Sequence, residues 1–372
     1  MRNQEIIFKN NSSSYKIIIG KKIINTLSQQ VKTLCPKTKK IALIIDSKVP
    51  KKIQLLIKKK IKKYKPVIFT FVAGEKTKNF YSVNKFLNSL ISKNFNRSDL
   101  LISVGGGITG DVAGFVASIF KRGINFINVP TTLLAQVDSA IGGKTGVNSP
   151  YGKNLIGSFY QPKLVLCDTI FLNSLSKKDM ICGYAEILKH SLIKDVKFFK
   201  WLKKNSKGIF LKKSDPLIYA IKKSCQIKTF FATRDTKEKG LRMKLNFGHT
   251  FAHAIEVKNN YSKNISHGEA VLSGMILETR LSVFKKICRV KDLKEIENIY
   301  KLNGLDYTLK KFSDKRTIVD LIPYFQNDKK NDDEKINFIL LKKIGKTTEP
   351  NKFKLSNNNL KKCAKYLLNS NF

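Results

Sequence analysis

Five short apolar runs in the first half of the chain constrain its fold more than any other feature. Each is apolar nearly throughout, and segments long enough for a helix separate them; the runs cover residues 40–46, 66–74, 100–107, 126–132 and 163–169. Strands buried on both faces have this composition, and helix-length connections join parallel neighbours. The pattern predicts a parallel sheet with helices on both faces.

The pattern changes after about residue 175. Segments such as "GYAEILKHSLI" and "GEAVLSGMILETRLSVF" carry apolar residues at helical spacing. One β-like run at 335–341 interrupts them, and a final amphipathic helix is expected at about 357–369. We therefore expect an α/β domain over residues 1–175 and a mostly helical domain over residues 176–372.

The charge is the most unusual feature of the composition. Its 71 Lys and Arg residues against 27 Asp and Glu residues give a formal net charge of +44, which ordinarily indicates a nucleic-acid or membrane partner. The excess is mostly Lys, runs through the whole chain and accompanies no zinc-finger or helix-turn-helix signature. We interpret it as a general surface bias that would attract an anionic substrate, and we expect no specific nucleic-acid partner.

Cysteine spacing and the N-terminus bear on the compartment. The six cysteines are scattered without a CxxC pair, and "MRNQEIIFKNNSSSYK" lacks the apolar core of a signal peptide. No apolar run reaches the ~18–20 residues of a membrane span. These features predict a cytoplasmic protein with reduced thiols and no membrane partner.

A glycine turn follows the third apolar run, in "LLISVGGGITGDVAGF". Such a turn lets backbone N–H groups and the start of the next helix approach a pyrophosphate. Its spacing is not the G-x-G-x-x-G dinucleotide fingerprint, so a purely structural turn stays open, although the position after a buried strand favours a nucleotide site. Asp46, at the end of the first run, is placed either to bind a ribose or to form a plain turn.

Residues 129–159 are dense in Gly, Ser, Thr, Asn and Lys. We expect a long irregular segment there, and such segments inside a compact domain tend to be functional. Lys144 and Lys153 suit a phosphate, while an exposed, solvated side chain is the alternative for any lysine of this chain. The glycines beside Lys144 would let the backbone pass close to a ligand.

Two of the only four histidines, His249 and His253, lie one helical turn apart in "NFGHTFAHAIE". This spacing is typical of the helix that binds zinc in metalloproteases, but a threonine stands where those enzymes carry their glutamate base. A third histidine, His267, follows after a short turn. A metal site on the His249–His253 pair is therefore one hypothesis.

Glu186 offers the rival hypothesis. It lies in the apolar helical segment "GYAEILKH" with Lys189 one turn on, which is the spacing of a surface ion pair. If the segment is buried, however, the carboxylate needs a cation or a metal. With His249 and His267 it would form a three-ligand site with an open coordination position, the pattern of a catalytic zinc site.

Together these stretches resemble the 3-dehydroquinate synthase family. The motifs occur in family order over roughly residues 40–345: "GGGITGDVAGF", "RGINFINVPTTLLAQVDSAIGGKTGVN", "GKNLIGSFYQP", "GYAEILKH", "GLRMKLNFGHTFAHAIE" and "SHGEAV". The resemblance implies an N-terminal Rossmann-like NAD-binding domain and a mostly helical C-terminal domain that binds metal and substrate. It also implies NAD+, one divalent metal per subunit (zinc, with cobalt as the alternative) and a homodimer.

The resemblance implies a role for each matching position. The metal ligands would be Glu186, His249 and His267. The NAD+ contacts would be Asp46, Glu75, Lys78, Gly106, Gly107, Asp111, Thr131, Thr132, Lys144 and Lys153. The catalytic groups would be Asp138, Lys189, Asn246 and the proton-transfer residue His253. The substrate phosphate would be bound by Lys144, Asn154, Lys330 and Arg122 of the partner subunit, and the substrate carboxylate by Lys228 and Arg242.

The implied reaction converts 3-deoxy-D-arabino-heptulosonate 7-phosphate to 3-dehydroquinate and phosphate, the second step of the shikimate pathway. Oxidation at C5 by NAD+ acidifies the C6 proton, phosphate is eliminated, the hydride returns and an intramolecular aldol step closes the ring. The rivals are a sister sugar-phosphate cyclase, a dehydrogenase of the glycerol dehydrogenase type and a basic nucleic-acid-binding protein. Lys228 and Arg242 favour a substrate that carries a carboxylate.

Three positions depart from the family pattern. Ala252 stands where Gly is usual and Ala140 where Ser is common, and we expect both small residues to be tolerated. Glu334 occupies a turn position that is often Gly, which bears on the placement of Lys329 and Lys330.

Overall fold

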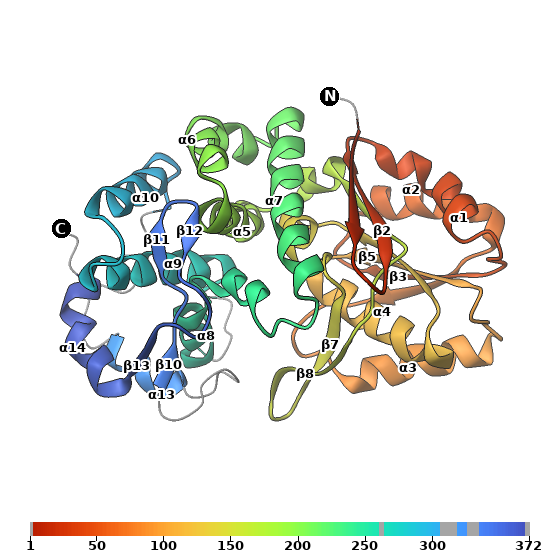
Figure 1. Ribbon diagram of the computed structural model, residues 1–372. Helices are drawn as coiled ribbons and strands as arrows, with labels where there is room; N and C mark the ends of the chain where they lie inside the picture. The colour runs from red at the N-terminus through yellow and green to blue at the C-terminus, as the bar shows by residue number, and fades with distance from the viewer. Residues whose placement is uncertain (1–2, 260–263, 306–317, 326–334, 369–372) are drawn as a thin grey trace. The chain divides into compact units, whose positions relative to one another are not determined.

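The structure is a computed structural model that describes residues 3–259, 264–305, 318–325 and 335–368 (Figure 1). Its contacts divide the chain into two compact units: Met1–Met180 with Lys212–Thr233, and Ile181–Leu211 with Arg234–Phe372. Helix α7 (Ser214–Arg234) belongs to the first unit, although it follows two helices of the second in the sequence. Nothing in the sequence pattern predicts this return.

A seven-stranded sheet forms the centre of the first unit. Across the sheet the strands are β1 (Gln4–Lys9), β2 (Ser14–Gly20), β9 (Leu164–Asp168), β6 (Asn125–Pro130), β5 (Leu100–Gly105), β3 (Ile41–Asp46) and β4 (Val67–Phe71). All neighbours are parallel except β1 and β2. The prediction of a parallel sheet built from the five apolar runs is confirmed, and every residue of β3 and β5 is buried.

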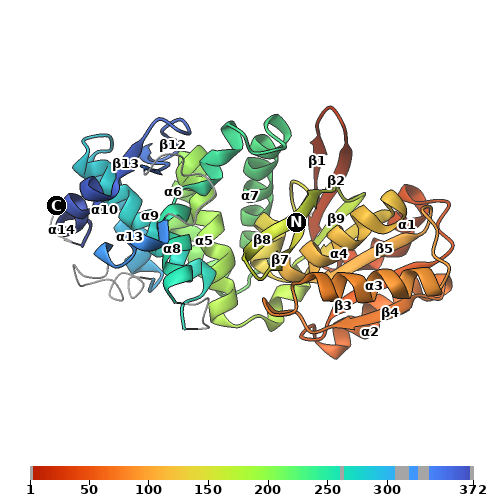
Figure 2. The same cartoon turned by 90° about the horizontal axis from the view of Figure 1, so that it is seen from below.

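Helices cover both faces of this sheet (Figure 1). On one face, α1 (Leu27–Leu34) and α2 (Lys51–Ile61) pack against odd-numbered residues of β3 such as Leu43. On the other face, α3 (Phe80–Ser92) and α4 (Gly107–Ile119) pack against even-numbered residues such as Ala42. Figure 2 shows α3 and α4 side by side from below. The alternation follows from the two-residue period of a strand.

The strand order contains a reversal point near the candidate nucleotide residues. β3 pairs with β4 on one side and with β5 on the other, so the direction of winding reverses between β3 and β5. In open α/β sheets, ligands bind beyond the carboxyl ends of the strands at this reversal. Here those ends are Asp46 and Gly105.

Two parts of the first unit differ from the prediction. The antiparallel pair β1–β2 at the N-terminus was not expected, because its apolar runs are short. The prediction of a long irregular segment over 129–159 is also wrong: after a short π-helical turn at Ala135–Ser139, strands β7 (Lys144–Ser149) and β8 (Gly152–Phe159) form an antiparallel hairpin. Its many glycines and polar residues concealed the strands.

The second unit is mostly helical, as predicted. Its helices are α5 (Lys177–Lys194), α6 (Val196–Phe210), α8 (His249–Lys258), α9 (His267–Phe284), α10 (Val290–Leu302), α13 (Ile322–Phe325) and α14 (Asn357–Leu368). The predicted β-like run at 335–341 divides between two small sheets, which pair β10 (Lys335–Asn337) with β13 (Lys354–Ser356) and β11 (Leu341–Lys343) with β12 (Lys346–Thr347). The expected last amphipathic helix is α14.

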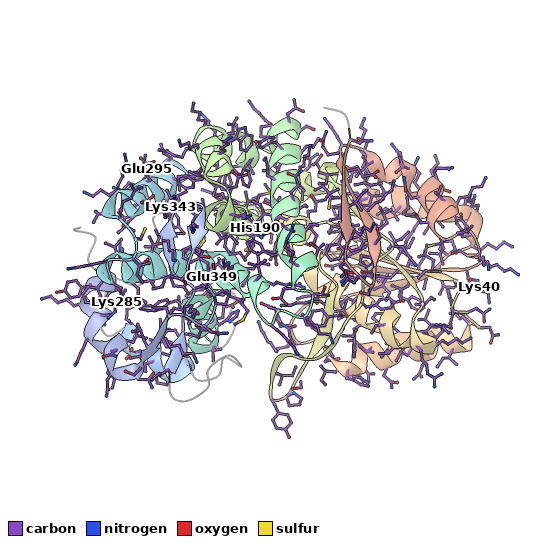
Figure 3. All side chains as sticks on the ribbon, viewed as in Figure 1. Lys40, His190, Lys285, Glu295, Lys343 and Glu349 are labelled. Atoms are coloured by element: carbon purple, nitrogen blue, oxygen red, sulfur yellow. The ribbon has the colours of Figure 1, made fainter. Side chains whose placement is uncertain are left out.

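No disulfide joins the cysteines, and the lysines are dispersed along the chain. All six cysteines are free, and within the described part of the chain no helix is both long and apolar enough to cross a bilayer. Lysines lie in many separate segments, as Lys40 before β3, Lys285 after α9 and Lys343 on β11 illustrate (Figure 3). This distribution agrees with a general surface bias.

Candidate active site

Three helices of the second unit bring Glu186, His249 and His267 together. Glu186 lies on α5, and the two histidines are the first residues of α8 and α9. Oε1 of Glu186 is 3.6 Å from Nε2 of His249 and 3.5 Å from Nε2 of His267. Two donor atoms bound to one tetrahedral zinc ion are about 3.4 Å apart, since each lies 2.0–2.1 Å from the metal. The residues therefore fit a divalent metal, with a coordination position left open.

The outer nitrogen of each imidazole has an acceptor beside it. Nδ1 of His249 lies 3.2 Å from the carbonyl oxygen of Phe247, and Nδ1 of His267 lies 3.3 Å from Oε1 of Glu256. A carbonyl or carboxylate can only accept, so Nδ1 carries the proton in both rings. Nε2 of each ring is then the metal-binding nitrogen, which is the usual arrangement around a histidine ligand.

The charges of the cluster are uneven. Burial raises the pKa of Glu186, but the Lys189 ammonium and the two imidazoles outweigh this and hold the pKa well below its usual range. Burial and the Lys189 ammonium hold the pKa of His249 well below its usual value. Burial also lowers the pKa of His267, yet bonding to the Glu186 and Glu256 carboxylates outweighs it and raises the pKa well above normal. A proton on His267 thus competes with a metal.

Lys189 and His253 flank the cluster without joining it. The Lys189 ammonium forms a buried ion pair with Oε2 of Glu186, which leaves Oε1 facing the histidines. The alternative of a surface Glu186–Lys189 pair is wrong, because both side chains are at most 2% exposed. His253 lies with its ring centroid 5.5 Å from that of His249 but is not part of the group of converging ligand atoms.

Glycines allow the three helices to approach closely enough. A Cβ on Gly268 would collide with the backbone of Cys182, one turn before Glu186 on α5. A Cβ on Gly274 of α9 would collide with the carbonyl oxygen of Gly248. Gly248 itself precedes α8 with φ +83°, a conformation that favours glycine. Backbone contact at these crossings sets the positions of the two histidines.

Glu278 of α9 fixes the start of α8. This fully buried carboxylate accepts the backbone N–H of Gly248 at 2.6 Å. Burial raises the pKa of Glu278 well above its usual value, although the N–H groups at the start of α8 act against the shift. The side chain occupies the favourable position for an acceptor at a helix N-terminus. It therefore holds the residue immediately before His249.

In the first unit, several residues expected to bind NAD+ lie at or just beyond the carboxyl ends of β3, β5 and β6. Asp46 is buried at the end of β3, and its Oδ1 accepts the N–H of Lys48 at 3.0 Å, so the plain-turn interpretation is correct at least for that oxygen. Gly106 caps α4 without a side-chain hydrogen bond, and Gly107 begins the helix. Open N–H groups at a helix start suit a pyrophosphate. Thr131 and Thr132 directly follow β6, the strand that pairs with β5.

Lys78 joins two of the expected ligand groups. Its Nζ donates to Oδ2 of Asp111 at 2.6 Å and to Oδ1 of Asn154 at 2.5 Å. Burial raises the pKa of Asp111, while Lys78 acts in the opposite direction. Lys153 pairs with the exposed Glu75 at 3.2 Å. The expected nucleotide residues are therefore connected to the hairpin β7–β8, which carries the expected phosphate residues.

Lys228 and Asp138 meet in the first unit. Nζ of Lys228 on α7 donates to the carbonyl oxygen of Asp138 at 2.6 Å and to its Oδ1 at 2.5 Å. The residue expected to bind a carboxylate is thus close to the catalytic candidate of the π-helical turn. Lys144, at the start of β7, is exposed.

The remaining candidates lie in several places. Arg242 is buried and donates from Nη1 to the carbonyl oxygen of Thr236 at 2.9 Å. Asn246 donates from Nδ2 to Oε1 of Glu238 at 2.9 Å. Arg122 is exposed in the first unit with φ +63°. Lys330 lies outside the described residues, as do Lys329 and Glu334.

Sequence reasoning missed Glu256, Glu278 and the helix-crossing glycines. Glu278 had a usable signal, because it is a carboxylate within the apolar helical run "GMILETRL". Glu256 follows His253 by three residues, so its position on the same helix could be predicted, but its approach to His267 depends on how α8 and α9 pack.

Solved structures share this fold. A 2-deoxy-scyllo-inosose synthase complexed with carbaglucose-6-phosphate, NAD+ and Co2+ is 26% identical, with a TM-score of 0.86 over 97% of this chain and 99% of that chain. A probable glycerol dehydrogenase from Sinorhizobium meliloti 1021 is 13% identical, with a TM-score of 0.62 over 95% and 96% of the two chains, and shows the fold alone. Fold and site define a class of enzymes that combine a parallel α/β unit with a helical unit.

Family models and curated relatives narrow this class. The model described as 3-dehydroquinate synthase N-terminal matches residues 68–182, and the C-terminal model matches residues 183–331. The curated 3-dehydroquinate synthase of Pelagibacter ubique (strain HTCC1062) is 49% identical over 335 residues, 90% of this chain and 91% of that protein. That of Caulobacter vibrioides (strain NA1000 / CB15N) is 37% identical over 89% and 90%. The chain belongs to the 3-dehydroquinate synthase family, the lyases that form 3-dehydroquinate in the shikimate pathway.

Proposed function

We propose that this chain converts 3-deoxy-D-arabino-heptulosonate 7-phosphate to 3-dehydroquinate and phosphate, with recycled NAD+ and one divalent metal, zinc or cobalt. The observation that carries the proposal is the convergence of Glu186, His249 and His267 in a member of this family. When bound, NAD+ supplies hydride acceptance and return, and the metal lowers the pKa of the hydroxyl that is oxidised. The related synthase with NAD+ and Co2+ supports this cofactor pair.

The two domains divide the binding tasks. Residues 1–175 bind the nucleotide through ten residues: Asp46, Glu75, Lys78, Gly106, Gly107, Asp111, Thr131, Thr132, Lys144 and Lys153. Residues 176–372 bind the metal and most of the substrate. Helix α7 packs with the first unit and contributes Lys228 from there.

Residues of the chain move protons and hold charges during the reaction. His253, close to His249 but outside the ligand group, transfers a proton at the substrate. Lys189 holds Oε2 of Glu186, so that Oε1 stays directed toward the histidine nitrogens. Asp138 and Asn246 donate or accept hydrogen bonds at the substrate hydroxyls. Each assignment uses a group that already lies in a defined hydrogen-bond environment.

The anionic ends of the substrate bind to separate cations. Lys144 and Asn154 bind the phosphate, with Lys330 and Arg122 of the partner subunit. Lys228 and Arg242 bind the carboxylate, and these two residues distinguish the substrate from sugar phosphates that lack a carboxylate. Arg242 is buried, and a guanidinium out of water binds a carboxylate strongly.

We further propose a homodimer in the cytoplasm. Arg122 is exposed on its own chain and available to a second copy. Two inactive variants, Arg122→Ala and His253→Ala, should recover about a quarter of wild-type activity when mixed and reassembled, because each mixed dimer holds one intact site. No recovery after demonstrated mixing would contradict a shared site.

The experiment for the proposed function is a phosphate-release assay. The purified protein receives 3-deoxy-D-arabino-heptulosonate 7-phosphate, NAD+ and zinc, before and after treatment with EDTA. We expect phosphate and 3-dehydroquinate in equal amounts, loss of activity on chelation and recovery with zinc or cobalt. Activity on a sugar phosphate without a carboxylate, but not on this substrate, would instead identify a sister cyclase.

A further inference from the structure

The hairpin β7–β8 contains a bulge at Asn148. From Lys144 to Val147 the residues of β7 pair in regular register with Phe159 to Ile156, but Ser149 then pairs with Gly152. Lys153, Asn154 and Leu155 therefore lie opposite the single residue Asn148. Bulges of this kind redirect side chains and often occur beside active sites. Here the bulge contains Lys153 and Asn154, both expected ligand residues.

Most of the hydrogen bonds described for Asn148 are made to residues outside its own hairpin. Its backbone N–H donates to the carbonyl oxygen of Lys78 at 2.8 Å, and its Nδ2 donates to Oε2 of Glu75 at 2.8 Å and to the Glu75 carbonyl oxygen at 3.2 Å. Its Oδ1 accepts the backbone N–H of Asn154 at 3.0 Å. One side chain therefore links the segment 75–79 to the strained part of the hairpin.

Asn154 shows what this link achieves. It has φ +55°, a strained conformation for a residue other than glycine, which its surroundings must hold in place. Asn148 holds its backbone, and Lys78 holds its Oδ1 at 2.5 Å. Because the amide oxygen is occupied, Nδ2 is the group that Asn154 can offer to another ligand. A donor is what a phosphate requires.

We propose that Asn148 is a positioning residue that couples the NAD+ site to the site for the substrate phosphate. This inference rests on the proposed function, which assigns Glu75 and Lys78 to the nucleotide and Asn154 to the phosphate. Ligation of NAD+ orders the segment 75–79, and Asn148 transmits that order to the bulge. The second ligand then binds to a site that the first has already ordered. It loses less conformational entropy on binding, so the two ligands bind cooperatively.

The coupling is measured by titrating NAD+ calorimetrically with and without saturating inorganic phosphate. For the wild type we expect phosphate to tighten NAD+ binding about fivefold or more, with reciprocal tightening of phosphate by NAD+. In Asn148→Ala, which removes both side-chain links, the factor should fall below about twofold. In Asn148→Asp, the acceptor for Asn154 remains, but the donor to Glu75 is replaced by a like charge, and the coupling should also be lost.

Ser149→Ala is the matched control, since Ser149 Oγ accepts only the N–H of Tyr151 among the contacts described, within the same hairpin. It should keep the wild-type factor. Wild-type coupling in either folded Asn148 variant, as judged by circular dichroism, overturns the inference, as does independent binding in a wild type that turns over its substrate. A wild type that binds NAD+ and releases no phosphate from the sugar phosphate contradicts the proposed function instead.

Discussion

At the residue scale, the proposed metal site depends on hydrogen bonds that fix each ligand. The carbonyl of Phe247 and the carboxylate of Glu256 take the Nδ1 protons of the two imidazoles, and Lys189 takes one oxygen of Glu186. Oε1 of Glu186 then lies 3.5–3.6 Å from Nε2 of each histidine. A bound metal would relieve the repulsion among the lone pairs of these atoms and would displace the competing proton.

Glu186→Gln or His267→Ala should remove the metal and the activity while NAD+ binding stays within about twofold of wild type, because the affected ligands lie in the other unit. Metal content by mass spectrometry and NAD+ titration measure the two effects. His253→Ala should retain the metal and lose turnover. Glu295→Gln, in a partly exposed pair with Lys203, is the control and should retain both. Full metal content in Glu186→Gln would remove that residue from the ligand set.

Metal affinity should increase with pH. The pKa of His267 is raised well above normal, and its neutral form is the one that binds a metal. As the pH rises through that pKa, the competing proton is lost. Calorimetry between about pH 6 and 8 in buffers of different ionisation enthalpy should show tighter binding at the higher pH and release of roughly one proton at the lower. Affinity that falls with pH would contradict the described charges.

The sequence alone left two metal sites open because i, i+4 spacing identifies residues on one helix face and nothing more. Glu186 is far from His249 along the chain and His267 lies on the next helix, so only the packing of α5, α8 and α9 brings the three together. The choice of these three residues as the ligands came from the resemblance to a family, through the matching motifs. Glu278 and Glu256 had no such motif, and their roles follow only from the structure.

At the element scale, glycines determine how the helices of the site meet. Gly274 of α9 lies where any side chain would collide with the carbonyl oxygen of Gly248. Helix α8 begins one residue later with His249. The distance between the two helices and the position of a metal ligand are thus set by the same contact.

Gly274→Ala should lower the free energy of unfolding by about 3 kcal/mol, because the added methyl forces α8 and α9 apart. Metal content should fall with it, since His249 and His267 lie on these two helices. Chemical denaturation and metal analysis provide the measurements. Gly74→Ala is the control, because its methyl would meet only Thr77 Oγ1, at 3.8 Å. Equal stability and metal content in the two variants would show that the crossing tolerates a side chain.

Elements differed in how well their sequences predicted them. The five buried parallel strands were recognisable because they are apolar throughout. The hairpin β7–β8 was not, since its strands contain glycines that a neighbouring backbone requires: a Cβ on Gly146 would collide with the backbone of Ile156. Composition suggested a loop where close packing of two backbones produced strands.

At the scale of the whole molecule, the charge of +44 raises the question of a polyanionic partner. Some of the acidic residues that the structure describes at the site pair with lysines, as in Lys78–Asp111 and Lys228–Asp138. The excess cations lie on many elements. Such a distribution attracts anions in general without selecting a sequence.

Duplex DNA should therefore bind weakly, without sequence preference, and at least about tenfold more weakly at 200 mM than at 50 mM salt. Fluorescence anisotropy with two unrelated duplexes at several salt concentrations measures this. Tight binding that survives the higher salt and distinguishes the duplexes would establish a nucleic-acid function in addition to the enzyme.

The sequence predicted only part of the division of the chain into two units. The pattern of apolar residues along the sequence predicted a single domain boundary near residue 175. In the structure, α7 belongs to the first unit although it follows α5 and α6. Helical periodicity indicates that α7 is a helix but not which core it joins. The contact between Lys228 on this helix and Asp138 depends on the chain topology, which the local sequence does not predict.

The central claim is that NAD+ is used and restored within each turnover. The most direct test counts the phosphate released per NAD+ when the metal-loaded enzyme receives excess sugar phosphate and less NAD+ than substrate, while absorbance at 340 nm follows NADH. We predict many phosphates per NAD+ and no accumulation of NADH. NADH that rises in step with substrate consumed, with no phosphate released, would contradict the claim and identify a simple dehydrogenase.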